Sequence, residues 1–321
     1  MSDSPLLEIK NLQVGFDTAS GLLMAVRGVD LEILPGEIAA LVGESGCGKS
    51  LTALSTLHLN EPPARVIAGE ILFKGENVLA MEPERLLTFR GAEASLIFQE
   101  PMTALNPVFS IGDQIIEVLM THGNFTKEAA REKTIHLLAM VGIPEPQSRI
   151  DRYPFELSGG MRQRAMIAMA LAMGPSLLIA DEPTTALDVT IQLQILELIK
   201  DLSKTKKMSV LLITHDIGIV SLIADKTAIM YAGEIMEFGD TTNVLKKKKH
   251  PYTQGLLNSL PSQFISGKKR KRLEPIPGSV PELKDIPDGC VFRNRCPHYQ
   301  QKCENEIELK YIGDHYYRCI L

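Results

Sequence analysis

Hydrophobic and polar positions follow two rhythms along this chain, and both predict strands. Residues 6–16 (LLEIKNLQVGF) and 29–33 (VDLEI) alternate between apolar and polar side chains, which predicts antiparallel strands with one buried face. Short unbroken apolar runs predict strands buried on both faces, as in a parallel sheet; they are IAALV (38–42), LLIAD (177–181), SVLLIT (209–214) and TAIMYA (227–232).

Segments with helical spacing separate these runs. They are KSLTALSTLHL (49–59), MRQRAMIAMALAM (161–173) and VTIQLQILELIKDLS (189–203). The pattern predicts an α/β fold with a mostly parallel core and a small antiparallel sheet on its N-terminal side. Residues from about 100 to 155 carry further helical stretches, DQIIEVLM and KEAAREKTIHLLAMVGI, and predict a helical insertion into the core.

Composition narrows the class of protein. A chain of 321 residues with 45% hydrophobic content can bury a full core, and we expect one large domain over 1–260 and an appendage over 261–321, where Pro, Cys and charged residues increase. The net charge of -5 argues against a dedicated nucleic-acid binder. No apolar run approaches the roughly 18 residues of a membrane-spanning helix, so we expect any membrane association to be peripheral.

A phosphate-binding loop lies between the first buried run and the first helix. GESGCGKS (43–50) satisfies G-x-x-x-x-G-K-[ST] in the strand-to-helix context that this motif requires. Backbone N–H groups there approach phosphate, Lys49 reaches the β- and γ-phosphates, and Ser50 ligates Mg²⁺. We expect the nucleotide to contact Gly43, Ser45, Gly46, Cys47, Gly48, Lys49, Ser50 and Leu51.

Two acidic residues end the second buried run. Asp181, at the carboxyl end of a parallel strand, is placed to hold Mg²⁺ directly or through water. Glu182 is a candidate general base for the water that attacks the γ-phosphate. A strand that ends in solvated acids is the alternative interpretation, which the phosphate loop upstream disfavours.

A second candidate anion site lies in LSGGMRQR (157–164). Ser158, Gly159 and Gly160 stand at the predicted start of a helix, where a hydroxyl and free backbone N–H groups attract anions. One nucleotide hardly needs two such sites, which raises the question of whose phosphate the second one contacts.

The order of these motifs resembles the ATP-binding subunit of an ATP-binding cassette (ABC) transporter over residues 6–260. The phosphate loop is followed by LIFQEPMTALNP, LSGGMRQR, LLIADEPTTALD and LLITHD. The resemblance implies a P-loop NTPase fold of the ABC type, with a RecA-like parallel-sheet core, an N-terminal antiparallel β subdomain and an α-helical subdomain. It also implies a head-to-tail dimer in which Ser158, Gly159 and Gly160 contact the partner's ATP.

Further residue roles follow from the resemblance alone. It implies that Gln99 links Mg²⁺ and the attacking water to the helical insertion, and that Asp188 crosses the dimer interface. His215 would contact the γ-phosphate, and Phe16 would stack on adenine. Met161 departs from the common signature, which has Gln, and this puts a ribose or phosphate contact at that position in doubt.

The C-terminal segments HPYTQGLLNSLP, PIPGSVPEL and GCVFRNRCPHYQQKC resemble the appendage of oligopeptide and dipeptide importers and their nickel-uptake relatives. The implied partners are a second ABC ATPase, expected to be a paralogue, two integral membrane permease subunits and an external peptide-binding protein, at the cytoplasmic face of the inner membrane. Peptide is the expected cargo and a nickel chelate the alternative; a soluble ABC ATPase without a transport role is the weaker candidate.

Four cysteines gather near the C-terminus. Cys290, Cys296, Cys303 and Cys319 lack the tight C-x-x-C spacing common in structural zinc sites, which favours a 4Fe–4S cluster. Zinc and unliganded thiols are the alternatives, and His298 and His315 are possible substitute ligands.

Overall fold

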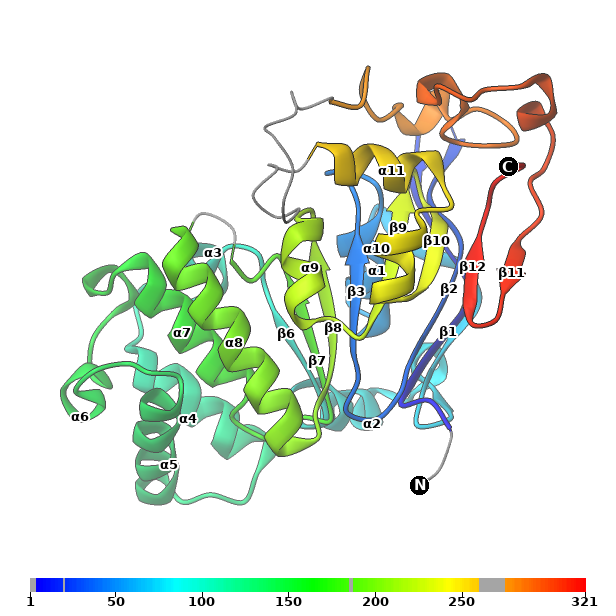
Figure 1. Cartoon of the computed structure of the whole chain (residues 1–321). Coiled ribbons are helices and arrows are strands. Elements are labelled where there is room, and N and C mark those ends of the chain that lie inside the picture. The colour runs from blue at the N-terminus through cyan, green and yellow to red at the C-terminus, as the bar shows by residue number, and fades with distance from the viewer. Residues whose placement is uncertain (1–3, 20, 185–186, 260–274) are drawn as a thin grey trace. The chain divides into compact units, whose positions relative to one another are not determined.

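The computed structural model describes residues 4–19, 21–184, 187–259 and 275–321. The chain falls into two compact units. Both ends of the chain, Met1–Leu79 and Ile213–Leu321, form the first unit, and the middle of the chain, 80–212, forms the second. Figure 1 colours the chain from the blue N-terminus to the red C-terminus.

An antiparallel sheet opens the first unit. Its strands are β1 (Leu7–Thr18), β2 (Gly21–Ile33), β4 (Ala64–Phe73) and β5 (Glu76–Asn77), in the order β2-β1-β4-β5. The predicted alternation is confirmed, because Leu7, Ile9, Leu12 and Val14 of β1 are buried while Glu8 and Lys10 between them are more exposed. The pattern did not predict β4, whose burial is irregular along its length.

The second sheet of this unit carries the phosphate loop. Strand β3 (Ile38–Val42) is buried at every position and pairs in parallel with β9 (Lys226–Tyr231). Three antiparallel strands follow on the other side of β9: β10 (Glu234–Asp240), β12 (His315–Tyr317) and β11 (Lys310–Ile312). The loop leaves β3 and leads into helix α1 (Lys49–Thr56), which ends three residues before the predicted helix does.

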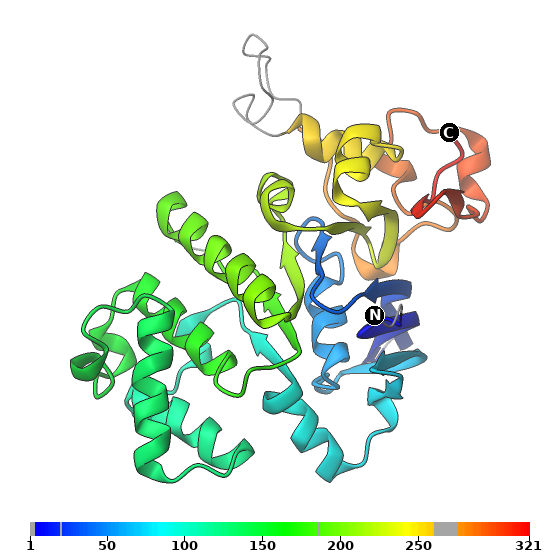
Figure 2. The ribbon, with the colours of Figure 1, turned by 60° about the horizontal axis from the view of Figure 1, so that its bottom comes forward.

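The C-terminal segment packs into this same unit. Helices α9 (Ile217–Ile223), α10 (Thr241–Lys247) and α11 (Pro251–Asn258) precede it, and short 3-10 turns at Leu283–Asp285, Arg293–Arg295 and Gln301–Glu304 run through it. Figures 1 and 2 both show the orange and red segment beside the yellow helices. One buried cluster joins Val42, Tyr231, Tyr252, Phe292 and Cys303. The C-terminal segment therefore shares a core with the strand that ends at the phosphate loop.

The second unit combines parallel strands with most of the helices. Strand β6 (Ala94–Ile97) pairs in parallel with β7 (Leu177–Asp181), and β8 (Ser209–Thr214) carries the chain on into the first unit. Its helices are α2 (Pro83–Thr88), α3 (Pro101–Ala104), α4 (Ile111–His122), α5 (Lys127–Met140), α6 (Pro146–Arg149), α7 (Gly159–Ala170) and α8 (Val189–Lys206).

Helix α7 packs against α3, α4 and α5. The helical stretch predicted near 100–155 thus contains α3 to α6, and α7 begins two residues earlier than the pattern predicted. Within the described ranges, no helix is long and apolar enough to cross a bilayer.

Candidate functional site

Glycines give the phosphate loop its shape. Gly46 and Gly48 have positive φ angles of 78° and 108°, which residues with a Cβ atom rarely adopt, and Gly48 caps the N-terminus of α1. A Cβ atom on Gly43 would lie 2.2 Å from the Met230 carbonyl oxygen, so only glycine fits there. These glycines therefore determine the shape of the loop, on which Ser45 and Ser50 are exposed while Leu51 is half-buried.

Lys49 is folded back onto the loop. Its side chain is buried, and Nζ donates to the carbonyl oxygens of Gly43 at 2.9 Å and Glu44 at 3.0 Å. The ammonium group thus lies inside the loop, at the N-terminus of α1, where the helix dipole and the loop amides favour an anion.

Cys47 fills the space beneath the loop. Its side chain is fully buried, and burial raises the pKa of the thiol although the nearby Lys49 charge acts in the opposite direction. A neutral thiol suits the role of a small filler.

Two more predicted residues of the first unit lie on strand ends. Phe16 is half-buried on β1, opposite Leu23 of β2 and Ala64 of β4. His215 follows β8 and is exposed. Helix α9 begins just after it, because the Asp216 side chain accepts the Gly218 N–H at 2.8 Å and so caps the helix.

In the second unit the structure brings Gln99 and Glu182 together. Gln99 Nε2 donates to Glu182 Oε2 at 3.1 Å, although the two residues belong to different segments. Asp181 is the last residue of β7, as predicted. Glu182 follows with a φ of 45°, a left-handed conformation that is costly for a residue with a side chain and that clusters at functional sites.

The LSGG segment forms a capped helix start. Ser158 is exposed, and its Oγ accepts the Met161 N–H at 3.3 Å. Asp188 caps α8 in the same way, accepting the N–H groups of Thr190 and Ile191 at 3.1 and 3.0 Å. The two helix starts are neighbours, since a Cβ atom on Gly160 would lie 3.2 Å from Ile191. Residues 185–186, between the acids and Asp188, lie outside the described residues.

The predicted metal ligation by the four C-terminal cysteines finds no support in the described residues. Cys290, Cys303 and Cys319 are buried and Cys296 is half-buried, and burial raises the pKa of Cys290 to about 11. The Cys290 N–H donates to the Cys303 carbonyl oxygen at 2.9 Å, and Cys290, Cys296 and Cys303 belong to or pack against the same buried cluster. Among the residues that the structure describes, however, no three His, Cys, Asp or Glu side chains lie in an arrangement that could hold a metal ion.

The substitute ligand His315 is engaged elsewhere. Its Nε2 lies 2.8 Å from Oε1 of the fully buried Glu237. The metal cluster was predicted from the spacing of the cysteines along the chain. Metal ligation depends instead on where the side chains point in the folded protein, which spacing does not give.

Three residues around the phosphate loop escaped the sequence analysis. The Glu44 N–H donates to the Tyr252 hydroxyl at 3.1 Å, and the Glu44 carboxylate accepts two hydrogen bonds from Arg295. Glu44 lies inside the motif, and a polar residue at a variable motif position was the only signal that could have pointed to it. Nothing in the sequence connects it with Tyr252 or Arg295.

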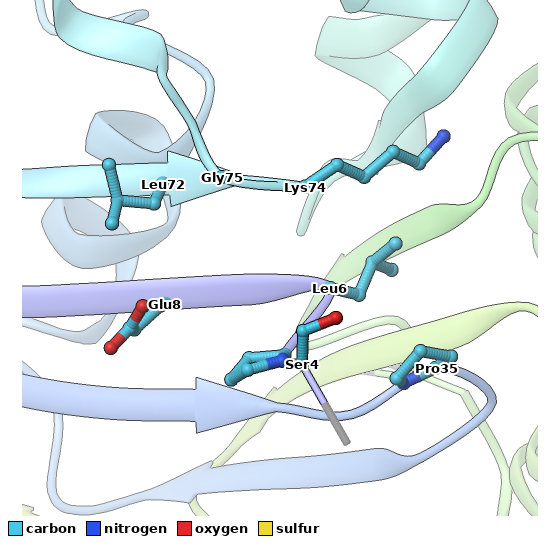
Figure 3. Close-up of a pocket in the computed structure, with 8 residues that line it drawn as sticks. Ser4, Leu6, Glu8, Pro35, Leu72, Lys74 and Gly75 are labelled. Atoms are coloured by element: carbon cyan, nitrogen blue, oxygen red, sulfur yellow. The ribbon is translucent and has the colours of Figure 1, made fainter. Parts of the chain in front are cut away.

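A hollow of about 440 Å³ lies elsewhere on the first unit. Figure 3 shows Glu8 and Lys74 toward its opposite ends, with Leu6, Pro35 and Leu72 along it. It contains none of the predicted nucleotide-binding residues, so size alone does not locate the candidate site.

Comparison with known proteins agrees with these motifs. The ABC transporter family matches residues 26–185, and the family described as oligopeptide/dipeptide transporter, C-terminal region, matches residues 236–303. The dipeptide transport ATP-binding protein DppD of Bacillus subtilis is 48% identical over 93% of this chain and 89% of its own length. The oligopeptide transport ATP-binding protein OppD of the same organism is 48% identical over 97% of this chain and 87% of its own.

Solved structures confirm the fold class. A dimeric bacterial ABC transporter cassette, MJ0796, is 26% identical with a TM-score of 0.66, over 73% of this chain and 98% of its own. The cassette cbiO1 of Clostridium perfringens is 25% identical with a TM-score of 0.65, over 77% of this chain and 93% of its own. The chain therefore belongs to the ATP-hydrolysing subunits of the ABC transporter family, among members that carry the oligopeptide/dipeptide transporter C-terminal region.

Proposed function

We propose that this chain hydrolyses ATP to energise the import of dipeptides or oligopeptides. The support is the similarity to DppD and OppD over nearly the whole chain, including the C-terminal region. A nickel chelate is not favoured as cargo, because the closely similar relatives are named for peptides. The domain division at residue 260 remains part of the proposal; residues 260–274 lie outside the described residues.

The phosphate loop is the proposed nucleotide site. The glycine-shaped loop, the helix start at Lys49 and the exposed hydroxyl of Ser50 fit a phosphate group with a bound Mg²⁺ ion. Ser50, Gln99 and Asp181 would hold the ion, which neutralises charge on the phosphates. Lys49 leaves its two carbonyl partners to bind the phosphates, and Phe16 and His215 contact the adenine and the γ-phosphate.

Glu182 is the proposed general base. The carrying observation is its hydrogen bond from Gln99 together with its left-handed backbone, which fixes the carboxylate at the end of β7. From there it accepts a proton from the attacking water while Gln99 holds its orientation.

The helix starts of α7 and α8 are proposed to act on a partner subunit's nucleotide. Ser158, Gly159 and Gly160 present an exposed hydroxyl and backbone N–H groups, and Asp188 stands beside them at the next helix start. This requires a second ATPase subunit. Two membrane permeases and an external peptide-binding protein complete the proposed importer at the cytoplasmic face of the membrane.

No step in this proposal uses a metal at the cysteines. The 4Fe–4S cluster and its zinc alternative stay predictions that neither the geometry nor the comparisons support. Iron, acid-labile sulfide and zinc content of the anaerobically purified chain decides between them.

Glu182→Gln tests the catalytic proposal. Loss of a general base lowers hydrolysis by about 10²–10⁴-fold, whereas ATP binding is retained because the phosphate loop is intact. The control is Glu197→Gln, an equal change at an exposed position on α8. Hydrolysis by the Glu182 variant at the rate of the control would remove Glu182 from the mechanism.

The transport proposal needs its own test. We expect the chain, tagged and extracted gently from native membranes, to bring with it two membrane subunits, a second cassette ATPase and a peptide-binding protein. Recovery with a nickel-binding protein, or alone, would contradict peptide import and leave the ATPase chemistry in place.

A further inference from the structure

Arg295 makes an unusually complete set of contacts for a residue of a C-terminal segment. Its side chain is only 6% exposed. The guanidinium donates to Glu44 Oε1 at 3.0 Å and Oε2 at 2.5 Å, to the Tyr231 hydroxyl at 3.3 Å and to the Pro277 carbonyl at 2.8 Å. The pair with Glu44 is bidentate, the geometry in which an arginine holds a carboxylate most firmly.

Glu44 transmits this contact into the phosphate loop. It follows Gly43 directly, and its backbone carbonyl accepts a hydrogen bond from Lys49 Nζ at 3.0 Å. Its own N–H donates to the Tyr252 hydroxyl. The side chain, amide and carbonyl of Glu44 are therefore all engaged, and one residue joins Arg295 to the lysine of the loop.

The negative charge of Glu44 explains why Arg295 matters for nucleotide binding. A carboxylate on a loop that binds several phosphate negative charges opposes the ligand, because like charges repel; the Glu44 side chain is 31% exposed, so water screens this repulsion only in part. Burial lowers the pKa of Arg295, but the hydrogen bonds and charges of Glu44 and Tyr231 raise it by more. The guanidinium thus stays charged and compensates the carboxylate.

Packing holds Arg295 in place. Phe292, three residues before it, lies with its ring centroid 5.2 Å from those of Tyr231 and Tyr252. All three rings are buried in the core that also contains Val42 of β3. The position of the guanidinium is therefore fixed by the same core that supports the loop.

We propose that Arg295 is a positioning residue of the nucleotide site, which neutralises and orients Glu44 so that the phosphate loop accepts ATP. The C-terminal segment then sets the affinity of the loop for nucleotide, although it lies outside the motifs. This inference rests on the proposed function of the loop as the ATP site.

The test is equilibrium binding of ATP to the full chain, measured by displacement of a fluorescent ATP analogue. Arg295→Met leaves the Glu44 carboxylate uncompensated and is expected to weaken ATP binding by about tenfold. Arg293→Met is the matched control, since Arg293 lies in the same turn and its guanidinium donates to the Asp288 carbonyl oxygen instead of to Glu44. The double variant Glu44→Gln with Arg295→Met removes the carboxylate as well and is expected to bind ATP as the wild type does.

Two results would overturn the proposal: equal ATP affinity of Arg295→Met and Arg293→Met, or a double variant as weak as Arg295→Met. Should Arg295→Met fail to fold, Glu44→Gln alone decides. It leaves the guanidinium uncompensated beside the loop, so it retains or tightens ATP binding if the proposal holds and weakens it if Arg295 acts only through structure.

Kinetics give a second readout in the assembled transporter. We expect Arg295→Met to raise the KM for ATP and to leave kcat unchanged. The reason is that the contact between Arg295 and Glu44 affects the bound ground state and the transition state equally. Lys49→Ala separates the two proposals: if the wild type binds ATP no better than Lys49→Ala, the loop is not the nucleotide site and the proposed function fails first.

Discussion

At the scale of single residues, His250 shows how burial makes a side chain sensitive to pH. Its ring is almost fully buried, Nδ1 accepts the Tyr252 N–H at 3.1 Å and thereby caps α11, and Nε2 has no hydrogen-bond partner among the residues that the structure describes. Burial lowers the pKa of His250 from 6.5 to about 3. The unfolded chain consequently binds a proton between these values that the folded chain does not.

The lowered pKa of His250 predicts that the free energy of unfolding depends on pH. The stability that a neutral His250 contributes is fully present above pH 6.5 and is lost as the pH falls toward 3. Between pH 7.5 and 5 we expect the wild type to lose about 2 kcal/mol more unfolding free energy than His250→Asn, which keeps the helix cap but does not titrate. Urea unfolding of both proteins at the two pH values measures this, and equal losses would show that His250 does not titrate on unfolding.

Site residues differed in how far sequence could predict them. The phosphate loop, Asp181 and Glu182 were visible because their chemistry depends on neighbours along the chain. The pair Arg295 and Glu44 was invisible because its members are 251 positions apart. The cysteines are the opposite case, since their clustering along the chain suggested a metal site, and the described residues show no metal-binding arrangement in support of it.

At the scale of elements, the buried strands and the long helices were predictable because each carries a clear period. Strands β3, β7 and β8 match their apolar runs residue for residue. The C-terminal strands β11 and β12 have three residues each, too few to show a period, and all three residues of β11 are exposed. These strands form because β12 pairs with β10 and β11 pairs with β12. Such pairing between segments far apart in the sequence cannot be predicted from a period along the chain.

Helix α7 yields a prediction that separates folding from catalysis. Ser158→Asp keeps a capping oxygen, so its unfolding free energy stays near that of the wild type, whereas Ser158→Ala loses about 1 kcal/mol. The carboxylate of Ser158→Asp repels a phosphate, so we expect ATP hydrolysis to fall by on the order of tenfold or more. Thermal unfolding and ATPase assays check both statements, and normal hydrolysis by Ser158→Asp would refute a phosphate contact at this helix start.

At the scale of the whole molecule, the sequence predicts an appendage after residue 260, and the described residues of 213–321 belong to the same compact unit as those of 1–79. Composition marks where proline and cysteine increase, but it cannot show which core a segment joins. Val291 and Phe292 are almost fully buried, and both belong to the cluster around Tyr231. The C-terminal segment is therefore a part of the phosphate-loop unit.

Removing a large side chain from the core around Tyr231 should destabilise the phosphate-loop unit. We expect Phe292→Ala to cost about 3–5 kcal/mol, the usual range for a large aromatic in a packed core. The control Tyr299→Ala removes a ring that is 46% exposed and should cost far less. Differential scanning calorimetry compares the two, and equal melting temperatures would show that the segment is not part of the core.

The division of the chain also governs the order in which the protein can be made. The second unit is one continuous stretch, 80–212, and all of it leaves the ribosome while the first unit still lacks its second half. Domains generally fold as units during synthesis, N-terminal parts first. Here the earlier segment, which carries the phosphate loop, must wait for much later residues such as Phe292 and Arg295 to be made. A nascent chain stalled before these residues would expose Ala40 and Val42 of β3, so chaperone binding to this segment is expected to persist until residues 290–307 are available for packing.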